Sequence, residues 1–238
     1  MRFDRLYFNC LQYQPESLMN SKFILLVVLV IGLTLVAVWA LPTSAAPQPS
    51  RVPQPGTWQL DFELHGNPKQ IQITLPGDTQ PRIFWYLLYT VTNNTSREVE
   101  FYPQFDLFTD NFLLYHAEDT ARKPVFEAIR KLYRQSIPLL EPQEMVTGKI
   151  LIGEDNARDS VAIFADFDPN ANSAKIFVSG LSNETVTVAN PVNQNSDTKK
   201  PEKILLRKTL MLQYQVPGDQ YNPRNRAMLY RSRNWIMR

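Results

Sequence analysis

The run IFWYLLYTV, residues 83–91, decides the fold. Apart from Thr90, its side chains are apolar at odd and even positions alike. Because successive side chains of a β-strand point to opposite faces, such a strand has to be covered on both faces. The turn-forming residues Asn93, Asn94 and Thr95 follow the run and end it. The sequence therefore predicts a central strand with a layer of structure on each side.

Shorter segments around this run show the pattern of half-buried strands. Residues 58–64 and 71–75 alternate apolar and polar side chains and are separated by a turn signal, so we expect an opening hairpin. Many short strands with turns between them are typical of a sandwich of two sheets. The predicted fold is mostly β, an immunoglobulin-like β-sandwich. Its further strands are expected at residues 99–108, 112–116, 148–152, 160–164, 175–178, 185–188, 205–214 and 228–235.

One amphipathic helix is expected within the β pattern. Residues 119–120 can cap it, and Pro124 suits its first position. Behind the proline an apolar stripe recurs at helical spacing, with charged residues on the other side. The stripe consists of Val125, Ile129, Leu132 and Tyr133. We expect this helix to cover one face of the central strand and the opposing sheet to cover the other. Residues 190–202, polar and interrupted by proline, are expected to form a mobile surface loop.

An uncharged apolar segment near the N-terminus predicts a membrane anchor. Residues 23–41 contain no charged side chain and, at about 1.5 Å per helical residue, are long enough to cross a bilayer of about 30 Å. Lys22 precedes the segment, and the next basic residue after it is Arg51. This bias places residues 1–22 in the cytoplasm and the main domain outside it. A cleaved secretory signal is the alternative, although its apolar region is usually only about 7 to 15 residues long.

The expected organisation has four parts. A cytoplasmic leader, residues 1–22, is followed by a transmembrane helix, residues 23–41. Residues 42–56 are rich in proline and predict an extended stalk. Residues 57–238 form the extracytoplasmic β domain. Because Cys10 is the only cysteine, this domain has no internal disulfide and is stabilised by its hydrophobic core.

Composition excludes some partners. The chain has 25 Lys+Arg against 23 Asp+Glu, a formal net charge of +2. Such a balance produces no global field toward polyanions, so nucleic acid is not an expected partner. The C-terminal run contains arginines interleaved with aromatic residues, and we interpret it as a final edge strand whose solvated arginines discourage edge-to-edge pairing. The arginines are Arg224, Arg226, Arg231, Arg233 and Arg238, and the aromatic residues are Tyr221, Tyr230 and Trp235. Trp235 is expected to pack into the core, and a contact with an anionic lipid, polymer or protein is the alternative for this run.

One stretch suggests a weak metal site. Oxygen-bearing side chains occur at alternate positions, as a hard cation such as calcium requires. These are Asp166, Asp168, Asn170 and Asn172. Ala171 stands where an EF-hand loop has glycine, and Phe177 where it has the bidentate glutamate. A simple turn between two strands is therefore the competing interpretation, and no cofactor is predicted.

Catalytic signals are weak. His116 with Glu118 and Asp119 is the histidine–carboxylate cluster of the sequence, and it could do acid–base chemistry only if its members were buried together. His65 lies in a turn without a partner at ligand spacing. No Gly-x-Ser-x-Gly elbow is present, so no covalent mechanism is indicated and no enzyme is predicted.

Several segments in the second half of the chain resemble a family. They are VTNNTSREVEFYPQFDLFTD, PVFEAIRKLY, LIGEDNARDSVAIF, KIFVSGLSNET, LRKTLMLQYQVPGD and NWIMR. Together they resemble a bacterial family of exported or membrane-anchored β-sandwich proteins with no assigned activity, over residues 89–238. The resemblance implies an extracytoplasmic location and transfers no catalytic residue. The strand leading into Val91-Thr92-Asn93 also looks like those immunoglobulin-like domains in which such a strand precedes a turn.

Two functional hypotheses follow. The first is a protein-interaction or envelope-assembly module with an envelope protein as partner, held to the cell membrane by residues 23–41. The alternative is a small-molecule or carbohydrate-binding β-sandwich, with or without the assistance of calcium. An exposed groove lined by Trp85 or Tyr115 would favour the alternative, whereas burial of these aromatic residues in the core would remove it.

Overall fold

The structure is a computed structural model that describes residues 46–117, 122–194, 201–217 and 226–238. The predicted leader and transmembrane helix, residues 1–41, lie outside the described residues, as do Glu118, Asp119 and Thr120. Within the described ranges, no helix is long and apolar enough to cross a membrane.

The first sheet is built on the predicted central strand. β3 (Arg82–Thr92) pairs along one edge with β8 (Arg158–Ala165). β1 (Asp61–Leu64) and β2 (Lys69–Ile73) share the other edge end to end. The predicted opening hairpin is therefore wrong, because β1 and β2 pair with β3 and not with each other. The long strand β3 offers each of them its own stretch of the same edge.

The second sheet has six strands. They are β5 (Gln104–Thr109), β6 (Leu114–His116), β9 (Ser173–Ser179), β10 (Thr185–Gln194), β11 (Pro201–Gln215) and β12 (Leu229–Met237). β9 and β10 run in the same direction and pair with successive parts of β11, while β12 lies along the other edge of β11. The predicted strand 99–108 is split in two, because β4 (Val99–Phe101) ends before Pro103 and pairs separately with β7 (Gly148–Ile150).

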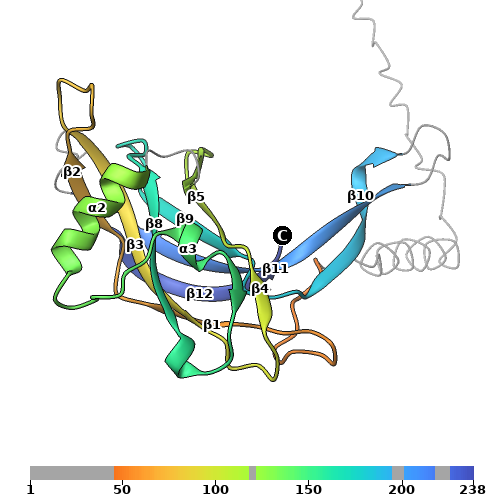
Figure 1. The fold of residues 1–238 in the computed structure, drawn as a ribbon. Coiled ribbons are helices and arrows are strands. Elements are labelled where there is room, and N and C mark those ends of the chain that lie inside the picture. The colour runs from red at the N-terminus through yellow and green to blue at the C-terminus, as the bar shows by residue number, and fades with distance from the viewer. Residues whose placement is uncertain (1–45, 118–121, 195–200, 218–225) are drawn as a thin grey trace, which may run out of the picture. The chain divides into compact units, whose positions relative to one another are not determined.

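The two faces of β3 are covered as predicted. Trp85, Leu87 and Tyr89 are buried in a core cluster that also contains residues of the second sheet, such as Phe105 and Leu212. The two sheets thus face each other across this cluster. On the other face, Phe84, Tyr86 and Leu88 are buried in a second cluster together with residues of the helix. Figure 1 shows this helix, α2, lying beside β3. The chain is thus mostly β, and the immunoglobulin-like arrangement of its strands stays a prediction.

The helix differs from the prediction in one side chain. α2 (Arg122–Tyr133) buries Val125, Phe126 and Ile129, whereas Leu132 is 65% exposed. Phe126 thus takes the place expected for Leu132 in the buried stripe. The sequence pattern also missed a second, short helix, α3 (Gln143–Val146), and a 3-10 turn, η2 (Glu154–Asn156).

A two-stranded ribbon replaces much of the predicted loop at residues 190–202. β10 continues to Gln194 and β11 begins at Pro201, so the described residues at both ends of this segment belong to strands. Residues 195–200 lie outside the described residues. Figure 1 shows β10 and the first part of β11 extending away from the two facing sheets. Cross-strand pairing explains the difference, because it supplies hydrogen bonds that polar residues accept as readily as apolar ones.

Candidate functional site

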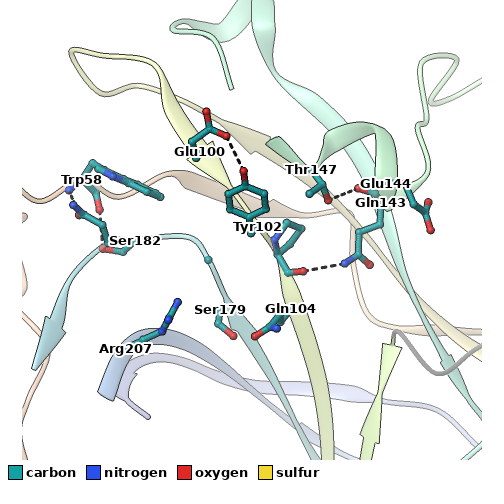
Figure 2. A pocket seen from close by; sticks show the side chains of 13 residues that line it. Trp58, Glu100, Tyr102, Gln104, Gln143, Glu144, Thr147, Ser179, Ser182 and Arg207 are labelled. Atoms are coloured by element: carbon teal, nitrogen blue, oxygen red, sulfur yellow. Dashed lines mark hydrogen bonds between the residues drawn. The ribbon is translucent and has the colours of Figure 1, made fainter. Parts of the chain in front are cut away.

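A pocket of about 650 Å³ opens beside the base of the ribbon (Figure 2). Its walls come from segments far apart in sequence: the chain before β1, the β4–β5 connection, α3, the β9–β10 connection and the middle of β11. Aromatic, amide, hydroxyl and charged side chains all line it. The aromatic ones are Trp58 and Tyr102, and the charged ones are Glu100, Glu144 and Arg207.

A glycine fixes two of these walls against each other. Gly180 has φ +88°, a backbone conformation that side chains disfavour. A Cβ atom at this position would lie 2.3 Å from the carbonyl oxygen of Tyr102 and 3.3 Å from Cα of Pro103. The β9–β10 connection therefore contacts the β4–β5 backbone directly, at a distance that only glycine permits.

Hydrogen bonds hold α3 and Tyr102 in place. The Nε2 group of buried Gln143 donates to the carbonyl oxygen of Pro103 over 3.0 Å. Thr147 Oγ1 donates to the carbonyl oxygen of Gln143 over 2.8 Å. The Tyr102 hydroxyl donates to Glu100 over 3.2 Å, and this hydrogen bond, with the charge of the carboxylate, raises the pKa of Tyr102. The Tyr102 residue itself is 62% exposed and available for contact.

On the opposite wall of the pocket, side chains of the β9–β10 connection form hydrogen bonds with the backbone of Trp58. The Trp58 N–H donates to Asn183 Oδ1 over 2.7 Å, and Ser182 Oγ donates to the Trp58 carbonyl over 2.7 Å. Figure 2 shows Trp58 and Ser182 on this side, with Arg207 of β11 nearby. Both walls of the pocket are thus held by bonds that need no ligand.

A second hollow of about 360 Å³ lies between the helices α2 and α3. Its lining includes Phe126 and Arg130 of α2 and Glu144 of α3. Glu144 also lines the larger pocket, so the two hollows adjoin at α3. The neighbouring Met145 is 64% exposed. We call the two hollows, with Tyr102 and Met145, the α3 surface.

The residues of the calcium hypothesis have other partners. Asp166 accepts hydrogen bonds from the guanidinium of Arg226, from Trp85 Nε1 over 2.9 Å and from the Phe167 N–H over 3.1 Å. Arg226 is 6% exposed, lies over the Phe167 ring at 4.7 Å and neutralises the carboxylate. A cation at Asp166 would therefore have to compete with a buried guanidinium.

The other three residues of the hypothesis form a turn. Asp168 accepts from the Asn170 N–H over 2.8 Å and also bonds to the Asn111 amide. The Asn172 N–H donates to Asp110 over 3.1 Å. Among the described residues, no group of three or more His, Cys, Asp or Glu side chains is arranged to hold a metal ion. The calcium site stays a prediction, and Arg226 is the feature that sequence reasoning missed.

The two histidines lie apart, each beside an aspartate. His116 Nδ1 is 2.7 Å from Asp106 Oδ1, and Arg238 donates to the other oxygen of Asp106 over 2.6 Å. His65 Nε2 is 2.6 Å from Thr90 Oγ1, which donates to Asp159. Neither histidine lines the pockets described above. Glu118 and Asp119, the expected partners of His116, lie outside the described residues.

The two aromatic residues that were expected to line an exposed groove are not exposed. Trp85 is 1% exposed and stacks on Phe167, and Tyr115 is partly buried against the same cluster. The pocket rings are instead Trp58 and Tyr102. Both residues lie in stretches that the sequence predicts as strands. Nothing in the sequence indicated that the two rings lie in the same pocket.

The end of the chain is confirmed as an edge strand. β12 pairs with β11 alone among the described strands, Arg231 and Arg233 are exposed, and Trp235 packs against the core. The expectation of solvated arginines is wrong for Arg226, which is buried because it pairs with Asp166.

No protein-family model, no curated protein and no solved structure matches this chain. The resemblance to a family of exported proteins therefore stays a prediction.

Proposed function

We propose that this chain is a membrane-anchored, extracytoplasmic protein-interaction module that assembles with an envelope protein. The uncharged segment at residues 23–41, with Lys22 before it, supports the anchor and its orientation. An immunoglobulin-like arrangement of the two facing sheets belongs to the same proposal. A single buried cluster shared by both sheets supports it.

The α3 surface is the observation that carries the interaction. Two adjoining hollows flank one short helix. Tyr102 lines the larger hollow and is 62% exposed, and Met145, which follows Glu144 in α3, is 64% exposed. Aromatic residues and methionine are enriched where proteins bind each other, and charged residues are common at the rim. Glu100, Glu144 and Arg207 supply charges of both signs around the pocket. A protein segment with a hydrophobic side chain and polar flanks would match this surface.

Site-specific photocrosslinking tests the proposal. A photoreactive phenylalanine analogue replaces Tyr102 in the full chain, and the matched control carries it at Tyr230, which is 47% exposed on β12. We expect irradiated membranes to give an adduct of one defined size from position 102 and none from position 230. A second change, Met145→Asp, should abolish the adduct while the far-UV circular dichroism stays unchanged. Equal adducts from both positions, or an adduct that survives Met145→Asp, would contradict the proposal.

A carbohydrate or other small polar ligand is the second candidate. The observation that favours it is the pocket itself, whose lining combines the aromatic side chains of Trp58 and Tyr102 with the hydroxyl and amide groups of Ser182 and Asn183. Calcium assistance, predicted at Asp166, Asp168, Asn170 and Asn172, belongs to this candidate, but none of these four residues lines the pocket. Saturation-transfer NMR with a neutral oligosaccharide separates the two hypotheses. Transfer that is lost with Tyr102→Ala, combined with no protein adduct at position 102, would favour the ligand.

A further inference from the structure

The outer edge of β10 has backbone groups that pair with no other strand in the described part of the chain. Arg207 exchanges both of its backbone hydrogen bonds with Arg238, at 2.7 and 3.0 Å, so its backbone faces β12. The next residue, Lys208, donates instead to the carbonyl oxygen of Glu184 over 2.9 Å. Residues along an antiparallel strand alternate in the edge they face. Leu206 and Ile204 therefore face β10.

The register then identifies the groups on the free side. Leu206 and Ile204 lie opposite Val186 and Val188, which are thus the residues of β10 that bond to β11. The backbone N–H and C=O groups of the alternate residues, Thr185, Thr187 and Ala189, face away from β11. Among the described strands, none pairs with β10 on this side.

The first half of this edge lacks protection. Residues 185–189 read TVTVA, with no charge and no proline, and four of the five are β-branched. The second half of β10 contains Pro191 and a register irregularity between Ala189 and Gln194, so the open stretch is confined to residues 185–189. Protein edge strands are commonly guarded by charges against pairing with another chain. The opposite edge of the same sheet, β12, follows that rule with exposed Arg231 and Arg233. The contrast indicates that β10 pairs with a partner strand.

We infer that the partner is β10 of a second copy of this chain, paired antiparallel with Thr187 opposite Thr187. In this register Thr185 faces Ala189 of the second copy, and Val186 faces Val188. Residues whose backbone N–H and C=O groups point away from β11 then lie opposite each other in the two copies. The hydrogen bonds of an antiparallel ladder can therefore form between them. Every pair is uncharged, and Thr–Thr and Val–Val are favourable cross-strand pairs. The strand is thus complementary to itself, as a two-fold dimer requires.

The side chains support the same pairing. Residues directly opposite each other in a ladder lie on the same face, so Val186 with Leu206 and Val188 with Ile204 form one apolar face of the ribbon. Ile204 is 36% exposed. Pairing at β10 joins this face to its copy and makes one continuous apolar strip. This contact is separate from the α3 surface and does not depend on the function proposed for it.

Disulfide trapping tests the register in the full chain. Because one strand pair covers less area than a standard interface of about 1,600 Å², we expect a weak dimer that a disulfide can capture. Cys10 is first replaced by serine. Thr187→Cys then places two thiols in a hydrogen-bonded pair with Cα atoms about 5.5 Å apart, within the range that disulfides need. We expect a covalent dimer under mild oxidation.

The matched control is Thr185→Cys, at a position that is exposed on the same face of β10. In the inferred register the two thiols introduced at position 185 would be offset by about 14 Å along the strands, so the dimer should form at least about tenfold more slowly. Adding Ala189→Cys to Thr185→Cys should restore it. Equal rates for the two single variants, or crosslinking of Thr187→Cys only to a different protein, would overturn the inference.

Val188→Lys, which puts like charges on the paired strands, should slow trapping at position 187. The photocrosslink at position 102 should be unaffected, so the two proposals fail separately.

Discussion

Gly180 is the residue at which backbone conformation and packing act together. Both Gly180 and Gly66 have positive φ, +88° and +95°, but only Gly180 lacks room for a Cβ atom. We expect Gly66→Ala to lower the free energy of unfolding by about 1 to 2 kcal/mol through backbone strain alone. Gly180→Ala should cost about 3 kcal/mol or more, because the clash with Tyr102 adds an overpacking cost. Urea unfolding of both variants measures the difference. Equal losses would mean that the contact at Tyr102 is not rigid.

Tyr214 carries a buried hydroxyl for which the described part of the chain supplies no hydrogen-bond partner. The residue is 2% exposed, and burial raises the pKa of its hydroxyl. Because an unsatisfied buried donor is costly, we expect Tyr214→Phe to leave the chain as stable or to stabilise it by about 1 kcal/mol. Tyr86→Phe is the control, since the Tyr86 hydroxyl lies 3.2 Å from that of Tyr133 and its loss should destabilise. Thermal unfolding checks both, and a large loss at Tyr214 would reveal a missing partner.

Local sequence could not show the partners of Asp166. The carboxylates and amides of residues 166–172 were visible as a pattern, and the turn interpretation matches the Asp168–Asn170 bond. Arg226, which lies 60 positions further along the chain, reaches Asp166 only through the fold. An ion pair between such distant residues leaves no periodic signal.

At the scale of elements, Glu184 connects the β9–β10 junction to β11 and to the proline-rich segment. It accepts from the Ser50 N–H over 2.7 Å and from Lys208 over 2.9 Å, and the Lys208 side chain is 1% exposed. Burial raises the pKa of Glu184, but the hydrogen bonds from Ser50 and Lys208 outweigh burial, and the pKa is lowered overall. The folded state therefore binds a proton at this site less readily than the unfolded chain.

The sign of the pH dependence follows from this lowered pKa. The contribution of Glu184 to stability is complete above the ordinary glutamate pKa of about 4.3 and is lost as pH falls through the lower folded-state value. Glu184→Gln should flatten this part of the stability curve between about pH 5 and pH 3. It should also cost about 3 kcal/mol at neutral pH, because Lys208 loses its countercharge in the interior. Urea titrations at several pH values measure both effects. The double variant with Lys208→Met should recover most of the loss, and its failure to do so would contradict the role of the pair.

The side-chain patterns predicted which segments form strands better than they predicted which strands pair with each other. The two-faced burial of β3 was readable, because apolar residues occupied both of its faces. The hairpin of β1 and β2 was not, since alternation says which face of a strand is buried and not which strand lies beside it. The polar residues 190–194 extended β10 for the same reason: backbone pairing with β11 leaves little trace in side-chain chemistry.

For the whole molecule, the proposed topology places residues 1–22 and the β domain on opposite sides of the membrane. The native Cys10 and a Thr79→Cys variant provide the two reporters, and Thr79 is exposed. In intact spheroplasts we expect a membrane-impermeant maleimide to label position 79 and not Cys10, with Cys10 labelled only after lysis. Labelling of Cys10 before lysis, with position 79 protected, would reverse the orientation. Equal labelling of detergent-solubilised samples is the control for thiol reactivity.

The predicted stalk also bears on the whole molecule. Ser50 lies within residues 42–56, yet it is bonded to Glu184 and accepts from Lys208 over 2.6 Å. The boundary of the domain at residue 57 stays a prediction, and these bonds show that Ser50 contacts the β domain.

The sequence by itself determined where most of the strands lie, that one of them is covered on both faces, and that a helix supplies one cover. Periodicity is enough for this, because each side chain reports whether its own face is buried. Only the tertiary structure decided that β1 and β2 share an edge, that Arg226 neutralises Asp166, and that Gly180 meets Tyr102 in the wall of a pocket. These features join positions that are distant along the chain, and their energies depend on packing and pairing geometry that no local pattern encodes.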